Sequence, residues 1–223
     1  MENYTTKYDE ALGGISHYQK YPKLLPFIGS NYNKRANRIL IVGESHYLPK
    51  DTKVDLLKWY DSDESSLSEE DKNYIDVRGL LTYAIRSNYK ADGHTIFRNI
   101  ESAALEIDFK SLNDSHFFSN VAFFNFYQRP AENTGDSIIA SQIDKEKGAE
   151  IFRQVTDIIN PTHIIFVSSK VRAEFTDEDL CDYYCGHAPH PAMPWWNRKS
   201  NRYGNITGKE KFQNFLKEHE LLG

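Results

Sequence analysis

The sequence has few cysteines, no long apolar run and no signal-like start. Its two cysteines, Cys181 and Cys185, are too few for a disulfide framework, so in a reducing compartment we expect free thiols. No apolar run approaches the roughly 18 residues that a membrane span needs. The first residues, MENYTTKYDEALGG, lack the basic start and apolar core of a secretory signal. We therefore expect a cytoplasmic protein with no membrane partner.

Positive charge is also scarce. The net charge of −5 excludes a general attraction to nucleic acid, so such a partner would need a local basic face. Two short clusters could provide one, although clusters of this size are commonly just solvated surface. They are Lys34, Arg35 and Arg38, and then Arg198, Lys199 and Arg202.

The composition is that of a folded protein. Of the 223 residues, 39% are hydrophobic and 26% are charged, which excludes a disordered chain. This length suits one well-buried core better than two. We expect a single domain spanning residues 1–223, and a monomer.

Four apolar segments predict strands. Residues 38–43 (RILIVG) form a continuous apolar run closed by glycine, typical of a strand buried on both faces. Residues 119–124 and 163–167 repeat the pattern, and residues 182–185 are a shorter candidate. We expect a four-stranded sheet.

Helical periods separate these segments. One starts at Ser68, with Asp71 three residues later, and a last one starts at Thr207, with Glu210 in the same relation. Alternating strands and helices predict a mostly parallel sheet covered on both faces, that is, a three-layer α/β/α domain. The apolar stripes are Tyr74, Val77, Leu81, Ala84 and Ile85; Ile96, Ile100, Ala103, Ala104 and Ile107; Ile151, Phe152, Val155, Ile158 and Ile159; and Phe212, Phe215 and Leu216.

Polar residues follow each predicted strand. The first strand leads into Gly43-Glu44-Ser45-His46-Tyr47, and the second into residues 125–130 (NFYQRP). Ser168 and Ser169 follow the third, and residues 186–197 (GHAPHPAMPWWN) follow the fourth. Ligands of open α/β sheets bind outside the carboxyl ends of the strands. We therefore expect one ligand site at the edge that the four strand ends share.

Three of these motifs resemble the uracil-DNA glycosylase superfamily. Residues 43–47 are similar to the family's first motif, a glycine followed by residues that position water and wall the base pocket. Asn125, followed by Arg129 and Pro130, is similar to the strand whose asparagine reads the base. Residues 190–194 (HPAMP) are similar to the loop that touches the leaving base and enters the DNA groove. Order and spacing match across residues 39–215.

The resemblance implies a glycosylase-like fold and a DNA substrate, single-stranded DNA included. The protein would extrude a damaged or deaminated pyrimidine and hydrolyse its bond to the sugar. Asn125 would read the base edge, because an amide offers a donor and an acceptor. Tyr47 would wall the base pocket together with Gly43 and Ser45, and Phe126 or Tyr127 would stack on the base.

The resemblance also assigns roles to the last loop. His190 would stabilise the negative charge of the departing base. The groove-entering wedge would consist of Met193, Trp195 and Trp196, and the flanking phosphates would contact Arg198 and Lys199.

The first motif departs from the family at the position that handles water. Well-known members have an aspartate where this chain has Ser45, so the resemblance leaves Glu44 or neutral His46 to orient water. Some branches hold an iron–sulfur cluster on four cysteines, which two cysteines exclude. We expect no cofactor and no metal.

Three alternatives remain open from the sequence. Gly43-Glu44-Ser45-His46 equally fits hydrolases resembling erythromycin esterases or haem-uptake lipoproteins, which place Gly-Glu-x-His after a strand. Ser45 in place of aspartate fits a non-catalytic relative that binds nucleic acid or a nucleotide. A zinc site is the third alternative, with four ligands: Cys181, Cys185, His187 and His190.

Overall fold

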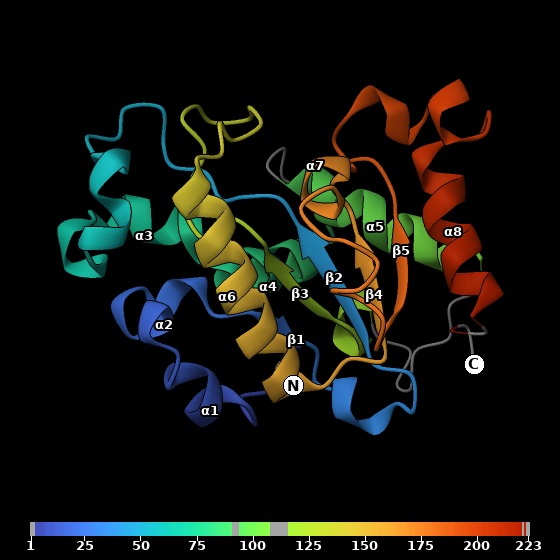
Figure 1. Cartoon of the computed structure of the whole chain (residues 1–223), viewed down its shortest axis with the longest axis horizontal. Helices are drawn as coiled ribbons and strands as arrows, with labels where there is room; N and C mark the ends of the chain where they lie inside the picture. Colours follow the sequence, from blue (N-terminus) through green and yellow to red (C-terminus); the bar gives the residue numbers. More distant parts are fainter. Residues whose placement is uncertain (1–2, 91–93, 108–115, 220, 222–223) are drawn as a thin grey trace.

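The chain folds around one mixed, five-stranded sheet (Figure 1). The computed structural model describes residues 3–90, 94–107, 116–219 and 221. The strand order is β1-β3-β2-β4-β5, in which β3, β2, β4 and β5 are parallel and β1 is antiparallel to β3. The strands are β1 (Phe27–Ile28), β2 (Ile39–Gly43), β3 (Ala122–Asn125), β4 (His163–Phe166) and β5 (Tyr184–His187).

The α/β class is confirmed, and the count of four strands is wrong by one. The additional strand, β1, has two residues, and Phe27 pairs with Phe123. Two residues are too few to show an alternating pattern, so periodicity could not identify this edge strand. Two predicted strands are also displaced along the chain: Phe117–Asn120 forms a 3₁₀ turn before β3, and β5 begins at Tyr184.

The inner parallel strands β2, β3 and β4 are mostly apolar because both faces of the sheet are covered there. Side chains alternate between the faces, so Leu40 and Val42 pack into one core and Ile39 and Ile41 into the other. All five residues of β2 are buried. The sheet therefore separates two hydrophobic cores.

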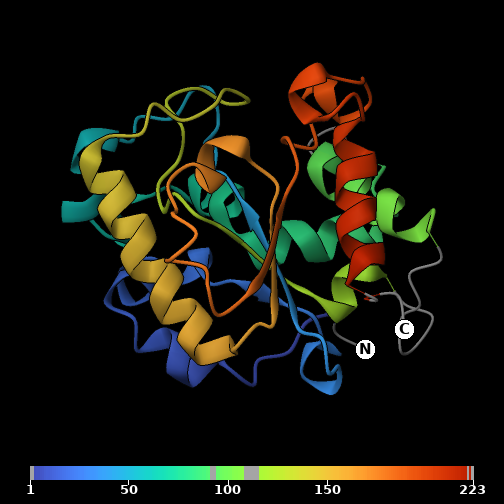
Figure 2. The same ribbon diagram turned by 45° about the vertical axis from the view of Figure 1, so that its right-hand side comes forward.

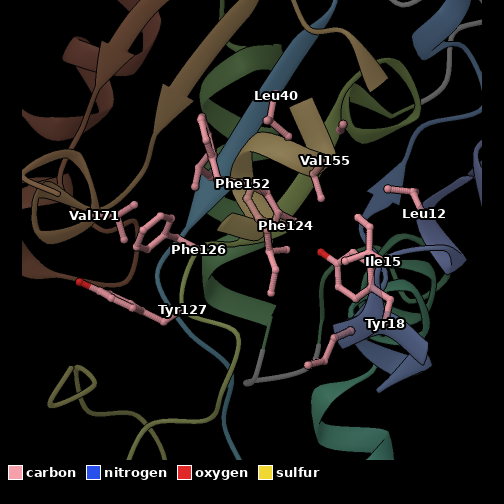
Figure 3. Packing of buried hydrophobic residues seen from close by; sticks show 14 of the residues in the cluster. Leu12, Ile15, Tyr18, Leu40, Phe124, Phe126, Tyr127, Phe152, Val155 and Val171 are labelled. Carbon is pink, nitrogen blue, oxygen red and sulfur yellow. The ribbon is translucent and has the colours of Figure 1, made fainter. Parts of the chain in front are cut away.

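Three helices contribute to the first core, α1 (Asp9–Gly13), α2 (Ser16–Lys20) and α6 (Gln142–Ile159). Phe152 of α6 stacks between Phe124 of β3 and Phe166 of β4, with ring centroids 6.3 Å apart in both pairs. Figure 3 shows Phe152 and Phe124 next to Val155 and Leu40. The short helices α3 (Glu69–Ile75) and α7 (Ser169–Arg172) border this core through Ile75 and Val171.

Three other helices cover the second core: α4 (Val77–Arg86), α5 (Thr95–Leu105) and α8 (Gly208–Glu218). Figure 2 shows α8 and α6 on opposite sides of the sheet. Phe212 and Leu216 of α8 are buried here, as the apolar stripe predicted.

Helix starts follow the capping signals of the sequence. Ser68 with Asp71, and Thr207 with Glu210, form reciprocal capping boxes at α3 and α8. The single helix expected after Ser68 is wrong, because Asp76 ends α3 and accepts the Gly79 N–H to start α4. The break leaves Tyr74, which was assigned to the apolar stripe, exposed.

None of the helices in the described residues is both long and apolar enough to cross a membrane.

Candidate functional site

The four parallel strands end side by side. Gly43 lies opposite Asn125 in the β2–β3 pair, Val42 lies opposite Phe166, and Phe166 lies opposite His187. The segments that follow these strands therefore meet at one edge of the sheet, as the sequence predicted.

Asn125 lies directly over Gly43. A Cβ at position 43 would approach Oδ1 of Asn125 to 2.2 Å and Cζ of Phe123 to 2.9 Å. A Cβ cannot approach an oxygen to 2.2 Å, so the Asn125 amide can occupy this position only because residue 43 is glycine. This contact explains why the apolar strand β2 ends in glycine.

His46 lies beside Asn125 but is only 4% exposed. Burial, together with the charge of His17, lowers its pKa to about 3, so the imidazole is neutral at neutral pH. Nδ1 of His46 is 3.4 Å from Nδ2 of Asn125, and Nε2 has no hydrogen-bond partner among the described residues. The expectation that His46 orients water is not met in this structure, because its ring lies beneath the surface and contacts the amide.

Glu44 connects three segments at the edge. Its two carboxylate oxygens accept hydrogen bonds from the hydroxyls of Ser137 and Ser168, the latter at 2.6 Å. Ser168 follows β4, as the sequence predicted for a strand end. Ser137 lies in the loop between β3 and α6, 93 residues along the chain from Glu44. Lys170 extends the contact, since its ammonium is 3.3 Å from the Ser137 hydroxyl.

His190 lies in the loop that follows β5. Burial lowers the pKa of its imidazole, and the negative charge of Glu44 acts in the opposite direction. The Ala192 N–H donates to Nδ1 of His190 at 3.3 Å. A neutral imidazole that accepts at Nδ1 carries its proton on Nε2. His190 can therefore donate a hydrogen bond from Nε2.

Tyr47 and Ser45 complete the first motif. Tyr47 is half-buried, and burial raises the pKa of its phenol, with contributions from the charges of Glu44 and Asp136. Ser45 is buried. Of these two side chains, only that of Tyr47 is partly accessible.

Two predicted site residues belong to the core instead. Phe126 is fully buried, with its ring 5.0 Å from Tyr127 and 5.3 Å from Phe175, so it cannot stack on a base in this structure. Trp196 is 1% exposed and packs on Phe212 of α8. The predicted wedge role of Trp196 is wrong for this reason.

The other predicted DNA-binding residues lie on the surface. Met193 and Trp195 are 50% and 46% exposed, and Arg198 and Lys199 are also exposed. In the first basic cluster, by contrast, Arg35 is buried, so that cluster does not form a continuous surface patch.

A buried ion pair holds the loop after β3. The Arg129 guanidinium donates to both oxygens of Asp144, at 2.7 and 3.0 Å, and also to Glu132 at 2.8 Å. Asp144 lies in the capping box of α6, which it forms with Ser141. The motif residue Arg129 therefore anchors the loop to α6 and is not directed at a ligand.

Sequence reasoning did not identify Ser137 or Lys170. No motif surrounds either residue, and only the fold brings the loop of residues 131–141 back to Glu44. The Ala131 N–H donates to the His46 carbonyl at 2.8 Å, and the Thr134 hydroxyl donates to the Leu48 carbonyl at 2.5 Å. These bonds position the loop against the first motif.

The proposed zinc ligands do not assemble. Throughout the described residues, no group of three or more His, Cys, Asp or Glu side chains is arranged to hold a metal ion. Cys181 is exposed, whereas burial raises the pKa of the Cys185 thiol to about 11, which disfavours the thiolate that zinc requires. The structure gives this alternative no support.

A cavity of about 250 Å³ lies next to the first motif, lined by residues of segments 48–56 and 131–134. Asn125, Glu44 and His190 do not line it. The strand-end site is therefore separate from this cavity.

Fold and site together define an α/β protein with a polar site at the carboxyl ends of its parallel strands. The sequence matches no model of a known protein family. A comparison with curated proteins finds no similar sequence either.

Proposed function

We propose that this chain is a divergent member of the uracil-DNA glycosylase superfamily. It hydrolyses the bond between the sugar and a damaged or deaminated, uracil-type pyrimidine in DNA. One observation carries the proposal: the Asn125 amide lies over Gly43, at the same sheet edge as Glu44 and His190. The four parallel strands within the five-stranded sheet, with helices on both faces, are compatible with it.

Asn125 is the proposed base reader. With neutral His46 on one side of the amide, its carbonyl oxygen and one N–H remain to pair with a pyrimidine edge. Because His46 stays neutral, the amide keeps this orientation over the physiological pH range. His46 is thus proposed as a positioning residue.

His190 is the proposed leaving-group residue. Cleavage of the glycosidic bond leaves negative charge on a carbonyl oxygen of the base. A donor aimed at that oxygen stabilises the transition state more than the ground state. The Ala192 N–H at Nδ1 directs the imidazole proton to Nε2, the nitrogen that is free to donate.

Glu44 is the proposed water-orienting residue, in place of the aspartate that Ser45 replaces. A carboxylate has about four acceptor positions, and the serine hydroxyls use two of them. The remaining positions can accept a proton from water. The exposed side chains of Met193 and Trp195 supply the wedge that fills the vacated stack.

The test is release of free uracil from oligonucleotides. Single- and double-stranded substrates with one uracil are incubated with protein, and the released base is quantified by mass spectrometry. Wild-type protein should release uracil, and Asn125→Ala should lower the rate by about a hundredfold, the typical effect of losing one well-placed polar contact. Asn133→Ala, an exposed asparagine in the neighbouring loop, is the matched control. Equal release by Asn125→Ala and wild type would reject this site.

A non-catalytic, nucleic-acid- or nucleotide-binding relative is the second candidate. It is favoured by the pairing of both Glu44 oxygens with serine hydroxyls, which occupy acceptor positions that a water molecule would otherwise use. Oligonucleotide binding without uracil release would support it. The Gly-Glu-x-His hydrolase alternative is weaker, because it needs an accessible His46.

A further inference from the structure

A second polar cluster lies at the same edge, where α8 meets the end of β5. The Lys211 ammonium of α8 donates to Nε2 of His187 at 2.9 Å and lies 5.6 Å from the centre of the Tyr203 ring. The Tyr203 hydroxyl is 3.3 Å from the Ser169 hydroxyl of α7. Four segments that are distant in sequence thus place an ammonium and two hydroxyls together.

The cluster carries an excess of positive charge. Burial and the charges of Lys211, Arg172 and Arg202 together lower the pKa of His187 to about 4. Arg172 is paired with Asp177 at 2.6 Å. In the described part of the chain, no carboxylate pairs with Lys211 or Arg202. Lys211 therefore contacts a neutral imidazole without a carboxylate partner among the described residues, and the positive charge of Arg202 adds to the field at His187.

The cluster adjoins the proposed catalytic site. Ser168 donates to Glu44, and the next residue, Ser169, contacts Tyr203. Because consecutive residues reach the two groups, a ligand at Glu44 would have its neighbouring substituents on the side of Ser169 and Tyr203.

We propose that Lys211, Arg202, Tyr203 and Ser169 bind a phosphate group of the nucleic-acid substrate. Ammonium, guanidinium and hydroxyl groups are the usual protein donors to phosphate oxygens. That the phosphate belongs to DNA rests on the proposed function. The cluster of positive charge is a feature of the structure and does not depend on glycosylase activity. This assignment replaces Arg198 and Lys199, the phosphate contacts predicted from the sequence, with residues that adjoin the strand-end site.

The test measures binding of a fluorescent single-stranded oligonucleotide without uracil, by anisotropy at several salt concentrations. One lost phosphate contact lowers the slope of log affinity against log salt by about 0.7 for a single strand. Lys211→Gln and, separately, Arg202→Gln should each show this decrease, with several-fold weaker binding at low salt. Arg202 is exposed, so Arg202→Gln should fold and keeps the test valid even if Lys211→Gln is unfolded.

Lys217→Gln is the matched control, an exposed lysine on another face of α8. If both test variants keep the affinity and slope of Lys217→Gln, the assignment is overturned. Because no cleavage is measured, a protein without uracil release can still support the phosphate site.

A second measurement distinguishes a nucleic-acid phosphate from that of a free nucleotide. The imidazole signals of His187 are followed by NMR at neutral pH during titration with a mononucleotide, against sodium chloride of equal ionic strength. Oligonucleotide binding sensitive to Lys211 supports a DNA phosphate. A His187 response to the mononucleotide, without oligonucleotide binding, retains the phosphate site and rejects the DNA function. If the wild-type protein shows neither oligonucleotide binding nor a His187 response to the mononucleotide, the phosphate site and the DNA function are both rejected.

Discussion

Gly43 and Asn125 depend on each other for the geometry of the site. The amide occupies the space that any side chain at position 43 would need. This dependence allows the base-reading role to be tested without altering Asn125 itself.

We predict that Gly43→Ala displaces the Asn125 amide. Overpacking of this kind costs about 1–3 kcal/mol of stability, and a shift of about 1 Å in a positioning group can lower a rate about a hundredfold. Urea unfolding and single-turnover uracil release measure the two effects. Gly13→Ala is the control, because a Cβ there has no neighbour within 4 Å. Wild-type activity in Gly43→Ala would contradict the account.

Two buried histidines make stability depend on pH. His17 and His46 have native pKa values of about 4 and about 3, below the ordinary 6.5 of the unfolded state. Below about pH 6.5 the unfolded chain takes up protons that the native protein does not. Stability should therefore fall with decreasing pH, down to these native values, by up to about 1.4 kcal/mol per pH unit for each histidine.

Urea unfolding between pH 7 and pH 5 measures this dependence. His46→Gln should flatten the curve, because it removes one of the histidines whose native pKa is lowered. Asn133→Ala, at an exposed position without a titratable side chain, is the control. An unchanged slope in His46→Gln would show that His46 is not held neutral.

Adjacent tryptophans in the 3₁₀ helix Pro194–Trp196 serve different purposes. Trp196→Ala should cost about 3–5 kcal/mol, because it leaves a cavity against Phe212. Trp195→Ala should change stability by less than about 1 kcal/mol and weaken DNA binding. Unfolding and anisotropy measurements on the two variants form a matched pair. Unchanged DNA binding by Trp195→Ala would remove Trp195 from the proposed wedge.

The loop after β3 depends on its ion pair with α6. Asp144→Asn should destabilise the protein by about 3 kcal/mol, because it leaves the buried Arg129 with only Glu132 as an acidic partner. Asp157→Asn, exposed on the same helix, should have little effect. Urea unfolding checks both variants, and equal midpoints would show that the pair contributes little.

Local signals predicted the larger elements well. Capping boxes and apolar stripes identified α5, α6 and α8, and continuous apolar runs identified the inner parallel strands β2, β3 and β4. Local signals failed where one residue or a distant partner decides the structure. Asp76 divides one expected helix into two, and β1 exists only through its pairing with β3.

At the scale of the whole molecule, the parallel sheet explains which residues meet. The segments that follow the parallel strands meet because parallel strands have their carboxyl ends at the same edge of the sheet. This rule applies to the sequence pattern alone. The burial of individual side chains did not follow from this rule. Trp196, Phe126 and His46 have residue types suited to a site, yet packing from distant segments covers them.

The central claim is that the Asn125, Glu44 and His190 site cleaves a base from DNA. The most direct measurement is a single-turnover assay, with protein in excess over a labelled uracil oligonucleotide, followed by alkaline cleavage of abasic sites. The account predicts cleavage by wild type and a loss of about a hundredfold or more in His190→Ala. No cleavage by wild type, or full cleavage by His190→Ala, would contradict it.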